Sequence, residues 1–313
     1  MSKNKNVKSN VISKYIFVYS ILAYFLILFA IFYVWVNFNS VLMSFKQFNA
    51  IGKFDTSDMQ WVGFDNFKSF IGKLTVSGGV VGISFLNSIK LHFISLVISV
   101  PLYILFSYLI FKKCAGHSVF RFIVLVPSIL SGFIICLMFK RFVLNGIPSL
   151  FVETFGWESF PNLLEDKKYA FTTVVFYGIW TSFSTNLIIY PNAMKEIDDG
   201  ILEAAQVDGV SNMFQELFYI ILPLIYPTIT TFLITGFTAI LTTDGSLITL
   251  YYENAPTSVS NMGYYFWKLV KKSTSYVDYP ELAAGGLLMT VIVAPLTILL
   301  RWFLKKIDPL ENM

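Results

Sequence analysis

Residues capable of metal binding or nucleophilic catalysis are few and lie far apart in the sequence. The chain has two histidines, His92 and His117, and two cysteines, Cys114 and Cys136. No acidic cluster accompanies the histidines, so we expect His92 to pack or to form hydrogen bonds inside the protein. Ser246 has no histidine in its own apolar segment or the next to act as its base. The sequence therefore predicts no metal centre, no serine nucleophile and no disulfide.

ATP binding through a phosphate loop is also excluded. That loop follows the pattern Gly-x-x-x-x-Gly-Lys, whose backbone N–H groups hold the phosphates. The chain has two Gly-Lys pairs, Gly52-Lys53 and Gly72-Lys73, and neither follows a glycine five residues earlier. Any energy from ATP must therefore come through a partner protein, and we expect neither enzymatic activity nor a cofactor.

Acidic residues are concentrated in one stretch, residues 194–223. It holds six of the 19 acidic residues: Glu196, Asp198, Asp199, Glu203, Asp208 and Glu216. Apolar residues recur at helical spacing on both sides of Gly209, and glycine is the residue that most easily adopts the left-handed conformation just past a helix end. The stretch predicts two short amphipathic helices joined at a glycine, a shape that fits the groove of a partner.

Composition indicates what kind of protein carries this stretch. Of the 313 residues, 56% are hydrophobic and 13% are charged. A soluble domain has about 25% charged residues. So few charges cannot cover a water-soluble body, and no clustered basic face suggests nucleic-acid binding. The chain is predicted to be an all-α membrane protein with the lipid bilayer around it.

Six apolar blocks are long enough to cross a bilayer, which takes about 20 residues per helix. A spanning segment must satisfy its own backbone hydrogen bonds, so the blocks are predicted to be helices. The first is too long for a cleavable signal and is expected to remain as an anchor. The chain is thus predicted to be one transmembrane domain, residues 1–313, with spans at about 15–42, 85–111, 119–139, 170–193, 224–250 and 282–303.

Basic residues favour a topology with both termini in the cytoplasm. The total of Lys and Arg is nearly equal on the two sides. The rule, however, weights short loops and residues close to the ends of the spans. The short turn 112–118 and the two termini are the densest basic stretches. In this topology the loop 194–223 is the only long cytoplasmic loop.

This loop resembles the Glu-Ala-Ala loop of ABC importer permeases, which seats on the ATP-hydrolysing subunit. The family pattern is Glu-Ala-Ala, three residues, Gly, about nine residues, then Ile-x-Leu-Pro. Val210 departs from the usual Ala, and ten residues rather than nine precede Ile220, which affects the register of the second helix. The resemblance implies coupling residues at Glu203, Ala204, Ala205, Asp208, Gly209, Leu222 and Pro223.

Further segments resemble carbohydrate-type permeases, in particular the larger maltose-type partner without its extra domain. They are Trp61-Val62-Gly63-Phe64-Asp65-Asn66-Phe67, Pro127, Trp180, Asn254-Ala255-Pro256 and Leu282-Ala283-Ala284-Gly285. The resemblance implies the type I ABC importer permease fold with cytoplasmic coupling helices, in a bacterial plasma membrane. It implies as partners a second permease subunit, two ATP-binding subunits and an extracellular substrate-binding protein. The implied function is uptake of a sugar or oligosaccharide.

The resemblance also implies a solute pathway lined by the third, fourth and fifth helices of the permease core. Hydroxyls can bind a sugar, glycine permits close approach, and tryptophan can stack on a sugar face. Small residues in membrane helices also serve helix packing, and that alternative stays open for each position. The implied pathway residues are Ser128, Gly132, Gly178, Trp180, Thr181, Ser182 and Gly236.

Two other functions stay open at this point. One is an ABC permease for a solute that is not a sugar. The other is a self-sufficient secondary carrier or channel. A proton-coupled carrier usually keeps a carboxylate near the middle of the membrane, and the predicted spans have none there.

Overall fold

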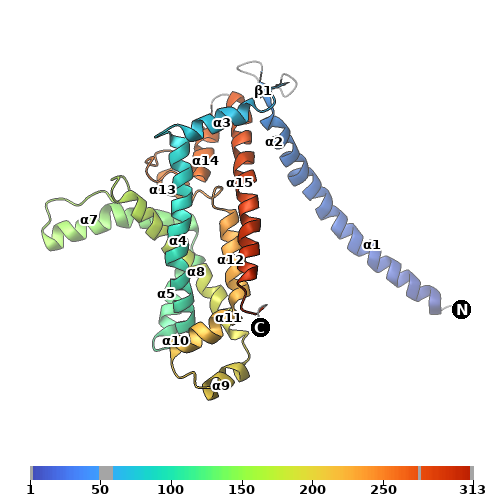
Figure 1. Cartoon of the computed structure of the whole chain (residues 1–313), viewed down its shortest axis with the longest axis vertical. Coiled ribbons are helices and arrows are strands. Elements are labelled where there is room, and N and C mark those ends of the chain that lie inside the picture. The colour runs from blue at the N-terminus through green and yellow to red at the C-terminus, as the bar shows by residue number, and fades with distance from the viewer. Residues whose placement is uncertain (1–2, 49–58, 274–275, 311–313) are drawn as a thin grey trace. The chain divides into compact units, whose positions relative to one another are not determined.

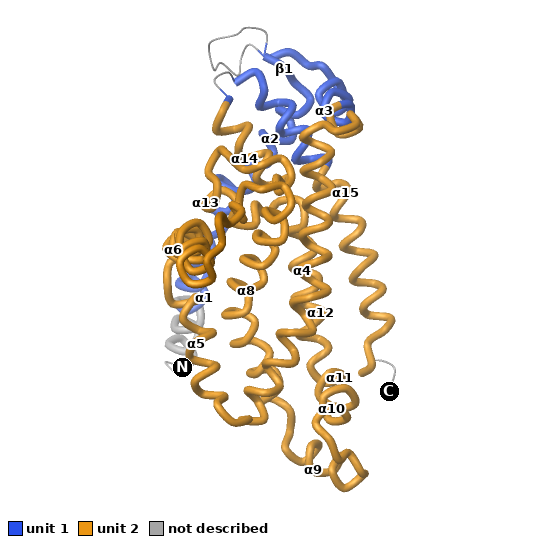
Figure 2. Tube along the Cα trace, turned by 90° about the vertical axis from the view of Figure 1, so that its left-hand side faces the viewer, with its two compact units in different colours: residues 1–72, 273–288 blue, residues 73–272, 289–313 orange. Residues whose placement is uncertain are grey.

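The computed structural model describes residues 3–48, 59–273 and 276–310, and most of these are helical. The chain divides into two compact units (Figure 2). The first comprises residues 1–72 and 273–288, and the second comprises residues 73–272 and 289–313.

The first unit begins with a long helical run and continues into a small hairpin. The run comprises α1 (Lys3–Phe29), the π-helical η1 (Ala30–Trp35) and α2 (Val36–Ser44). Its large apolar side chains from Tyr15 to Val41 are exposed, as expected where lipid is the solvent. Strand β1 (Lys46–Phe48) then pairs antiparallel with β2 (Met59–Trp61). Helix α3 (Asp65–Thr75) follows, and the amide of Asn66 donates to the carbonyl oxygens of Ser44 and Lys46 at 2.9 and 2.8 Å.

The second unit is built on two long helices, α4 (Val80–Phe111) and α8 (Ala170–Lys195), which pack against each other. Helix α12 (Tyr226–Thr238) runs along the same direction (Figures 1 and 2). Pro101 lies inside α4 and Pro191 inside α8. Two apolar clusters hold the unit together, one around Tyr177 and Leu250, the other around Tyr190 and Ile221.

Four described helical segments are long and apolar enough to cross a membrane: Lys14–Ser44, Val80–Phe111, Gly132–Thr154 and Tyr276–Lys306. A fifth candidate is the bent pair Met213–Leu224 and Tyr226–Thr238, whose halves meet at 68°. The last segment consists of η6 (Tyr276–Asp278) and α15 (Tyr279–Lys306). The predicted spans at 15–42, 85–111 and 282–303 lie inside these segments, and the predicted span at 170–193 coincides with α8.

The predicted third span, residues 119–139, is two helices instead of one. Helix α5 (His117–Ile129) ends two residues after Pro127, Leu130 is extended, and α6 (Gly132–Arg141) then starts. Proline has no N–H to donate to the preceding turn, which weakens the helix at this point. Helix α6 continues through η3 (Phe142–Gly146), α7 (Ile147–Ser149) and η4 (Leu150–Thr154). This arm runs across the direction of α4 (Figure 1).

The predicted fifth span, residues 224–250, is also interrupted. Helix α12 ends at Thr238, and a series of turns leads to α13 (Leu247–Tyr251). Gly245 and Ser246 both have positive φ angles, 58° and 67°. Two consecutive residues in this conformation cannot continue a right-handed helix. Of the six predicted spans, those at 15–42, 85–111 and 282–303 therefore lie in candidate spans, whereas α8 is a continuous helix that is not among the candidates. Residues 140–154, which the prediction places between spans, belong to the candidate span Gly132–Thr154.

Candidate functional site

The loop 194–223 forms two helical segments on either side of a glycine. The first is α9 (Asp199–Val207), and the side chain of Asp198 caps it by accepting a hydrogen bond from the Gly200 N–H at 2.7 Å. An acidic N-cap satisfies a free N–H group and interacts favourably with the helix dipole. Gly209 follows with φ = 97°, a left-handed conformation that favours glycine. Helices on both sides of Gly209 agree with the sequence prediction.

The second segment comprises α10 (Met213–Glu216), η5 (Leu217–Ile221) and α11 (Leu222–Leu224). The Asn212 side chain caps it by accepting a hydrogen bond from the N–H of Gln215 at 2.8 Å. Pro223 lies in α11, whose last residue is Leu224, and the chain then turns by 68° into α12. The residues of η5 are π-helical and lie in the stretch where the sequence has ten residues between Gly209 and Ile220.

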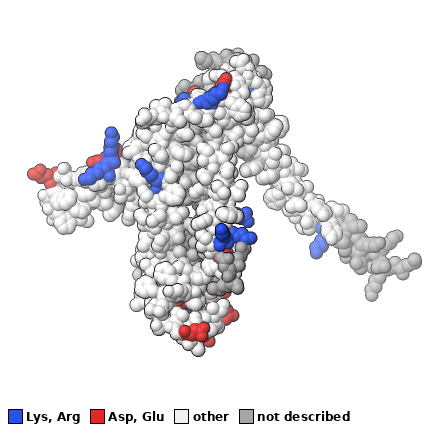
Figure 3. All heavy atoms as spheres, viewed as in Figure 1, with Lys and Arg blue, Asp and Glu red and all other residues white. Residues whose placement is uncertain are grey.

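The two halves of the loop differ in burial. Glu203, Ala204, Asp208 and Gly209 are exposed, and Ala205 is the one buried residue of α9. Leu222 and Pro223 are half-buried. Acidic side chains lie at the end of the second unit that α9 forms, in the lower part of Figure 3. Exposed apolar side chains accompany them, namely Ile201, Val207, Met213, Phe214, Phe218 and Tyr219.

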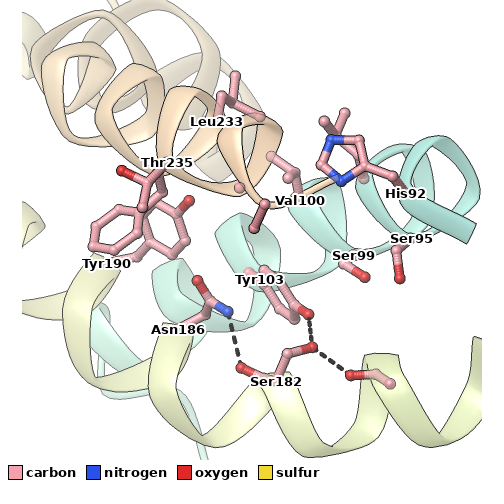
Figure 4. A pocket seen from close by; sticks show the side chains of 15 residues that line it. His92, Ser95, Ser99, Val100, Tyr103, Ser182, Asn186, Tyr190, Leu233 and Thr235 are labelled. Atoms are coloured by element: carbon pink, nitrogen blue, oxygen red, sulfur yellow. Dashed lines mark hydrogen bonds between the residues drawn. The ribbon is translucent and has the colours of Figure 1, made fainter. Parts of the chain in front are cut away.

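A cavity of about 520 Å³ lies between α4, α8 and α12 (Figure 4). Three of the predicted pathway residues line it: Gly178, Ser182 and Gly236. Ser128, Gly132, Trp180 and Thr181 do not. The Ser128 hydroxyl donates to Leu125 O and that of Thr181 to Tyr177 O, both within their own helices. The Trp180 ring packs beside the rings of Phe139 and Tyr177.

The cavity wall also contains polar residues of α4 that the sequence argument missed. Their positions, 92, 95, 99 and 103, place His92, Ser95, Ser99 and Tyr103 on one face of the helix, since residues three or four apart are neighbours. A polar stripe at this spacing within an apolar span is a signal that could have revealed them. Asn186 and Tyr190 of α8 and Thr235 of α12 complete the polar wall.

Hydrogen bonds link α4 to α8 at one end of the cavity, whereas two polar atoms further along α4 have no partner. The Tyr103 hydroxyl bonds to Ser182 Oγ, and Asn186 Nδ2 donates to Ser182 O at 2.8 Å. The buried atoms His92 Nε2 and Ser99 Oγ have no hydrogen-bond partner. Burying such groups unpaired is unfavourable, so this part of α4 is less well satisfied than the part bonded to Ser182. Among the described residues that line the cavity, none is Lys, Arg, Asp or Glu.

A second polar contact fixes the segment between α13 and α14 (Met262–Lys272). The amide nitrogen of Asn87, a buried residue of α4, lies 3.2, 3.0 and 3.0 Å from the carbonyl oxygens of Thr257, Ser258 and Ser260. Ser84 bonds to Ser260 through their hydroxyls at 2.9 Å. In α14, burial raises the pKa of the Tyr264 hydroxyl, which accepts a hydrogen bond from Ala255 N in this segment.

Replacing Asn87 with leucine is expected to loosen this segment. Leucine has a similar size but no donor, so buried carbonyl groups lose their partner at a cost of about 1–3 kcal/mol. We expect a lower Tm in detergent and faster amide hydrogen exchange at residues 257–262. Asn37→Leu is the matched control, because the Asn37 amide is exposed and bonds to Tyr33 O within its own helix. Unchanged amide hydrogen exchange at residues 257–262 in the Asn87 variant would show that the Asn87 side chain does not hold this segment in place.

The comparisons with known proteins identify the class. Residues 75–311 match the family described as binding-protein-dependent transport system inner membrane component. The chain therefore belongs to this family and is a membrane component of a transport system, not a catalytic subunit. The family predicted from the sequence is thereby confirmed.

Two relatives and one solved structure make the similarity more specific. The chain is 25% identical over 308 residues to the probable ABC transporter permease protein YesP of Bacillus subtilis, covering 96% of this chain and 93% of that protein. It is 24% identical to the multiple sugar-binding transport system permease protein MsmF of Streptococcus mutans, covering 90% and 93%. A bacterial ABC transporter involved in the import of the acidic polysaccharide alginate has a chain that superposes with a TM-score of 0.78 at 21% identity, covering 95% and 98%. This likeness shows that the chain has the ABC permease fold.

Proposed function

We propose that this chain is the permease subunit of an ATP-driven importer that moves a sugar or oligosaccharide across the bacterial plasma membrane. The observation that carries the proposal is the loop 194–223, where the Glu203-Ala204-Ala205 sequence lies on an exposed helix that ends near a left-handed Gly209. Its exposed Met213, Phe214, Phe218 and Tyr219 are of residue types enriched in protein interfaces, and its acidic side chains can complement a basic partner surface.

In this proposal the loop binds one of two ATP-hydrolysing subunits. When these two subunits close on each other, the loop transmits the movement to the membrane helices. A second permease subunit completes the pathway, and an extracellular binding protein delivers the solute. Both termini and the loop then lie in the cytoplasm. The whole chain acts as one transmembrane domain, with Glu203, Ala204, Ala205, Asp208, Gly209, Leu222 and Pro223 as coupling residues.

The cavity between α4, α8 and α12 supports a neutral, hydroxyl-rich solute. Its wall offers hydroxyl, amide and imidazole groups together with apolar surface, the usual composition of a site for an uncharged polar ligand. Binding an anion there would require a cation or several aimed N–H groups to offset desolvation. The residues proposed to contact solute are Gly178, Ser182 and Gly236 with the polar face of α4, whereas Ser128, Gly132, Trp180 and Thr181 are proposed to act elsewhere along the pathway.

The sugar assignment also draws on a relative. The protein named as a multiple sugar-binding transport system permease aligns over 90% of this chain. The alginate importer carries an acidic polysaccharide, which differs in charge from the solute proposed here. Uptake of an anionic solute in preference to neutral sugars would contradict the proposed substrate class while leaving the permease role intact.

Charge reversal at Glu203 tests the coupling role. In Glu203→Lys an exposed anion of α9 becomes a cation, and like charges across an interface cost several kcal/mol, so we expect uptake to fall by about tenfold or more. The measurement is solute uptake and binding-protein-stimulated ATP hydrolysis by the intact complex in proteoliposomes. Glu158→Lys, a reversal at an exposed position between η4 and α8, is the control. If Glu203→Lys transports as well as the control, the loop does not dock on the ATPase.

A further inference from the structure

A largely buried ion pair joins the loop 194–223 to the end of α4. Lys112 directly follows the last residue of α4, and Glu216 is the last residue of α10. The distance from Lys112 Nζ to Glu216 Oε2 is 2.9 Å, and the side chains are 29% and 10% exposed. The ion pair between Lys68 and Asp65, in contrast, has side chains that are 77% and 69% exposed. Buried pairs depend strongly on both partners, because either charge alone is left uncompensated.

The surroundings of the pair are apolar apart from the Tyr108 hydroxyl, which lies beside Glu216. Leu217 and Ile221 of η5 are buried in one cluster with Tyr103, Ile104 and Tyr108 of α4 and with Tyr190 and Met194 of α8. Such contacts are strong but non-directional. They hold the second half of the loop against α4 and α8. The ion pair is directional, so it sets the orientation of α10 on the end of α4.

The first half of the loop has no ion pair of this kind among the described residues. Ala205 is the one buried side chain of α9, the half-buried Ile197 and Leu202 pack against the same apolar cluster, and Gly209 separates α9 from α10. The ion pair therefore lies where the exposed half of the loop meets the part that is packed on the membrane helices. Helix α4, to which the pair connects, also carries the polar face of the cavity from His92 to Tyr103.

We propose that Lys112 and Glu216 are positioning residues that transmit movement of the coupling loop to α4, and through α4 to the cavity. This inference rests on the proposed function, since it requires that the loop docks on an ATPase. Lys112 is well placed for this role, because a cation at a helix C-terminus also interacts favourably with the helix dipole. When α10 moves, the end of α4 then moves with it, and α10 does not slide over α4.

The test compares uptake per ATP hydrolysed in the complete reconstituted complex. We expect Glu216→Gln and Lys112→Met each to assemble and to hydrolyse ATP, but to lower uptake per ATP by at least about fivefold, the lower end of coupling between two sites. The charge-exchanged double variant, Lys112→Glu with Glu216→Lys, is expected to recover most of that loss. A side chain that merely filled space would not show recovery on charge exchange.

The matched control is Lys113→Met, which removes the neighbouring exposed cation and is expected to leave uptake per ATP unchanged. Normal coupling in both single variants would overturn the inference, as would equal losses in the single and double variants. Failure of the single variants to assemble would also overturn it, because the pair would then serve folding alone. If the unmodified complex shows no ATP-driven uptake, or Glu203→Lys has no effect, the proposed function itself fails.

Discussion

Replacing Gly209 with proline is expected to abolish solute uptake. Gly209 has φ = 97°, whereas the proline ring fixes φ near −65°, so the native backbone cannot form. The substitution also removes the N–H that donates to Gln206 O at 3.2 Å. Helix α9 must then leave α10 in a different direction. Since a misplacement of about 1 Å in a positioned group can cost about 100-fold in rate, uptake should fall below detection.

The measurement is uptake and stimulated ATP hydrolysis in proteoliposomes, with co-purification of the ATPase as a second readout. Gly156→Pro is the matched control, because Gly156 also has a positive φ, 70°, and is exposed. It lies between η4 and α8, outside the loop 194–223. We expect the control to retain uptake. If Gly209→Pro retains uptake as well, the relative orientation of α9 and α10 has no part in coupling.

Filling the cavity is expected to have an effect of similar size by a different route. A Cβ atom added at Gly178 meets no atom within 4 Å, and one added at Gly236 meets only a carbon of the His92 ring at 3.7 Å. Leucine at either position can therefore extend into the cavity without displacing the packed helices. The double variant Gly178→Leu with Gly236→Leu should abolish uptake while leaving assembly and basal ATP hydrolysis intact.

This combination separates a blocked solute site from a broken coupling loop. Gly72→Leu is the control, since a Cβ at this α3 position also meets no atom within 4 Å. Uptake is measured with a panel of radiolabelled neutral and anionic saccharides. Unimpaired uptake in the double variant would show that solute does not enter this cavity.

The sequence was sufficient to predict the helical membrane class, the family and the position of the loop. These features depend on block length, on charge placement and on residues that are close together in the chain. Asp198, Gly209 and Asn212 act through contacts within a few residues, so their local structure follows from spacing. The bounds of α8 could also be predicted, because its apolar block ends at polar residues on both sides.

Features that depend on tertiary contacts were harder to predict. The break after Pro127 lies within an apolar run, where hydropathy gives no boundary. The break at Gly245 lies in the polar stretch Thr242-Thr243-Asp244-Gly245-Ser246, a turn signal that the length of the surrounding apolar block obscured. The cavity combines residues of α4, α8 and α12 that are far apart in sequence, so only three of the seven predicted pathway residues lie on its wall. The pairing of Lys112 with Glu216 spans 104 residues and could not be inferred from local spacing.

Pro101 creates a point in α4 at which the helix bends more easily. A proline at this position removes the hydrogen bond to the carbonyl oxygen of Val97, so bending stiffness drops there first. The weak point lies between Ser99 and Tyr103, at the level of the cavity. From Pro101 to Phe111 the helix is about 15 Å long, so a tilt of about 10° at Pro101 moves its end by roughly 2.6 Å. A small displacement at Lys112 can therefore change the width of the cavity. The part of α4 before Pro101 stays in place, because Asn87 is hydrogen-bonded to the segment between α13 and α14.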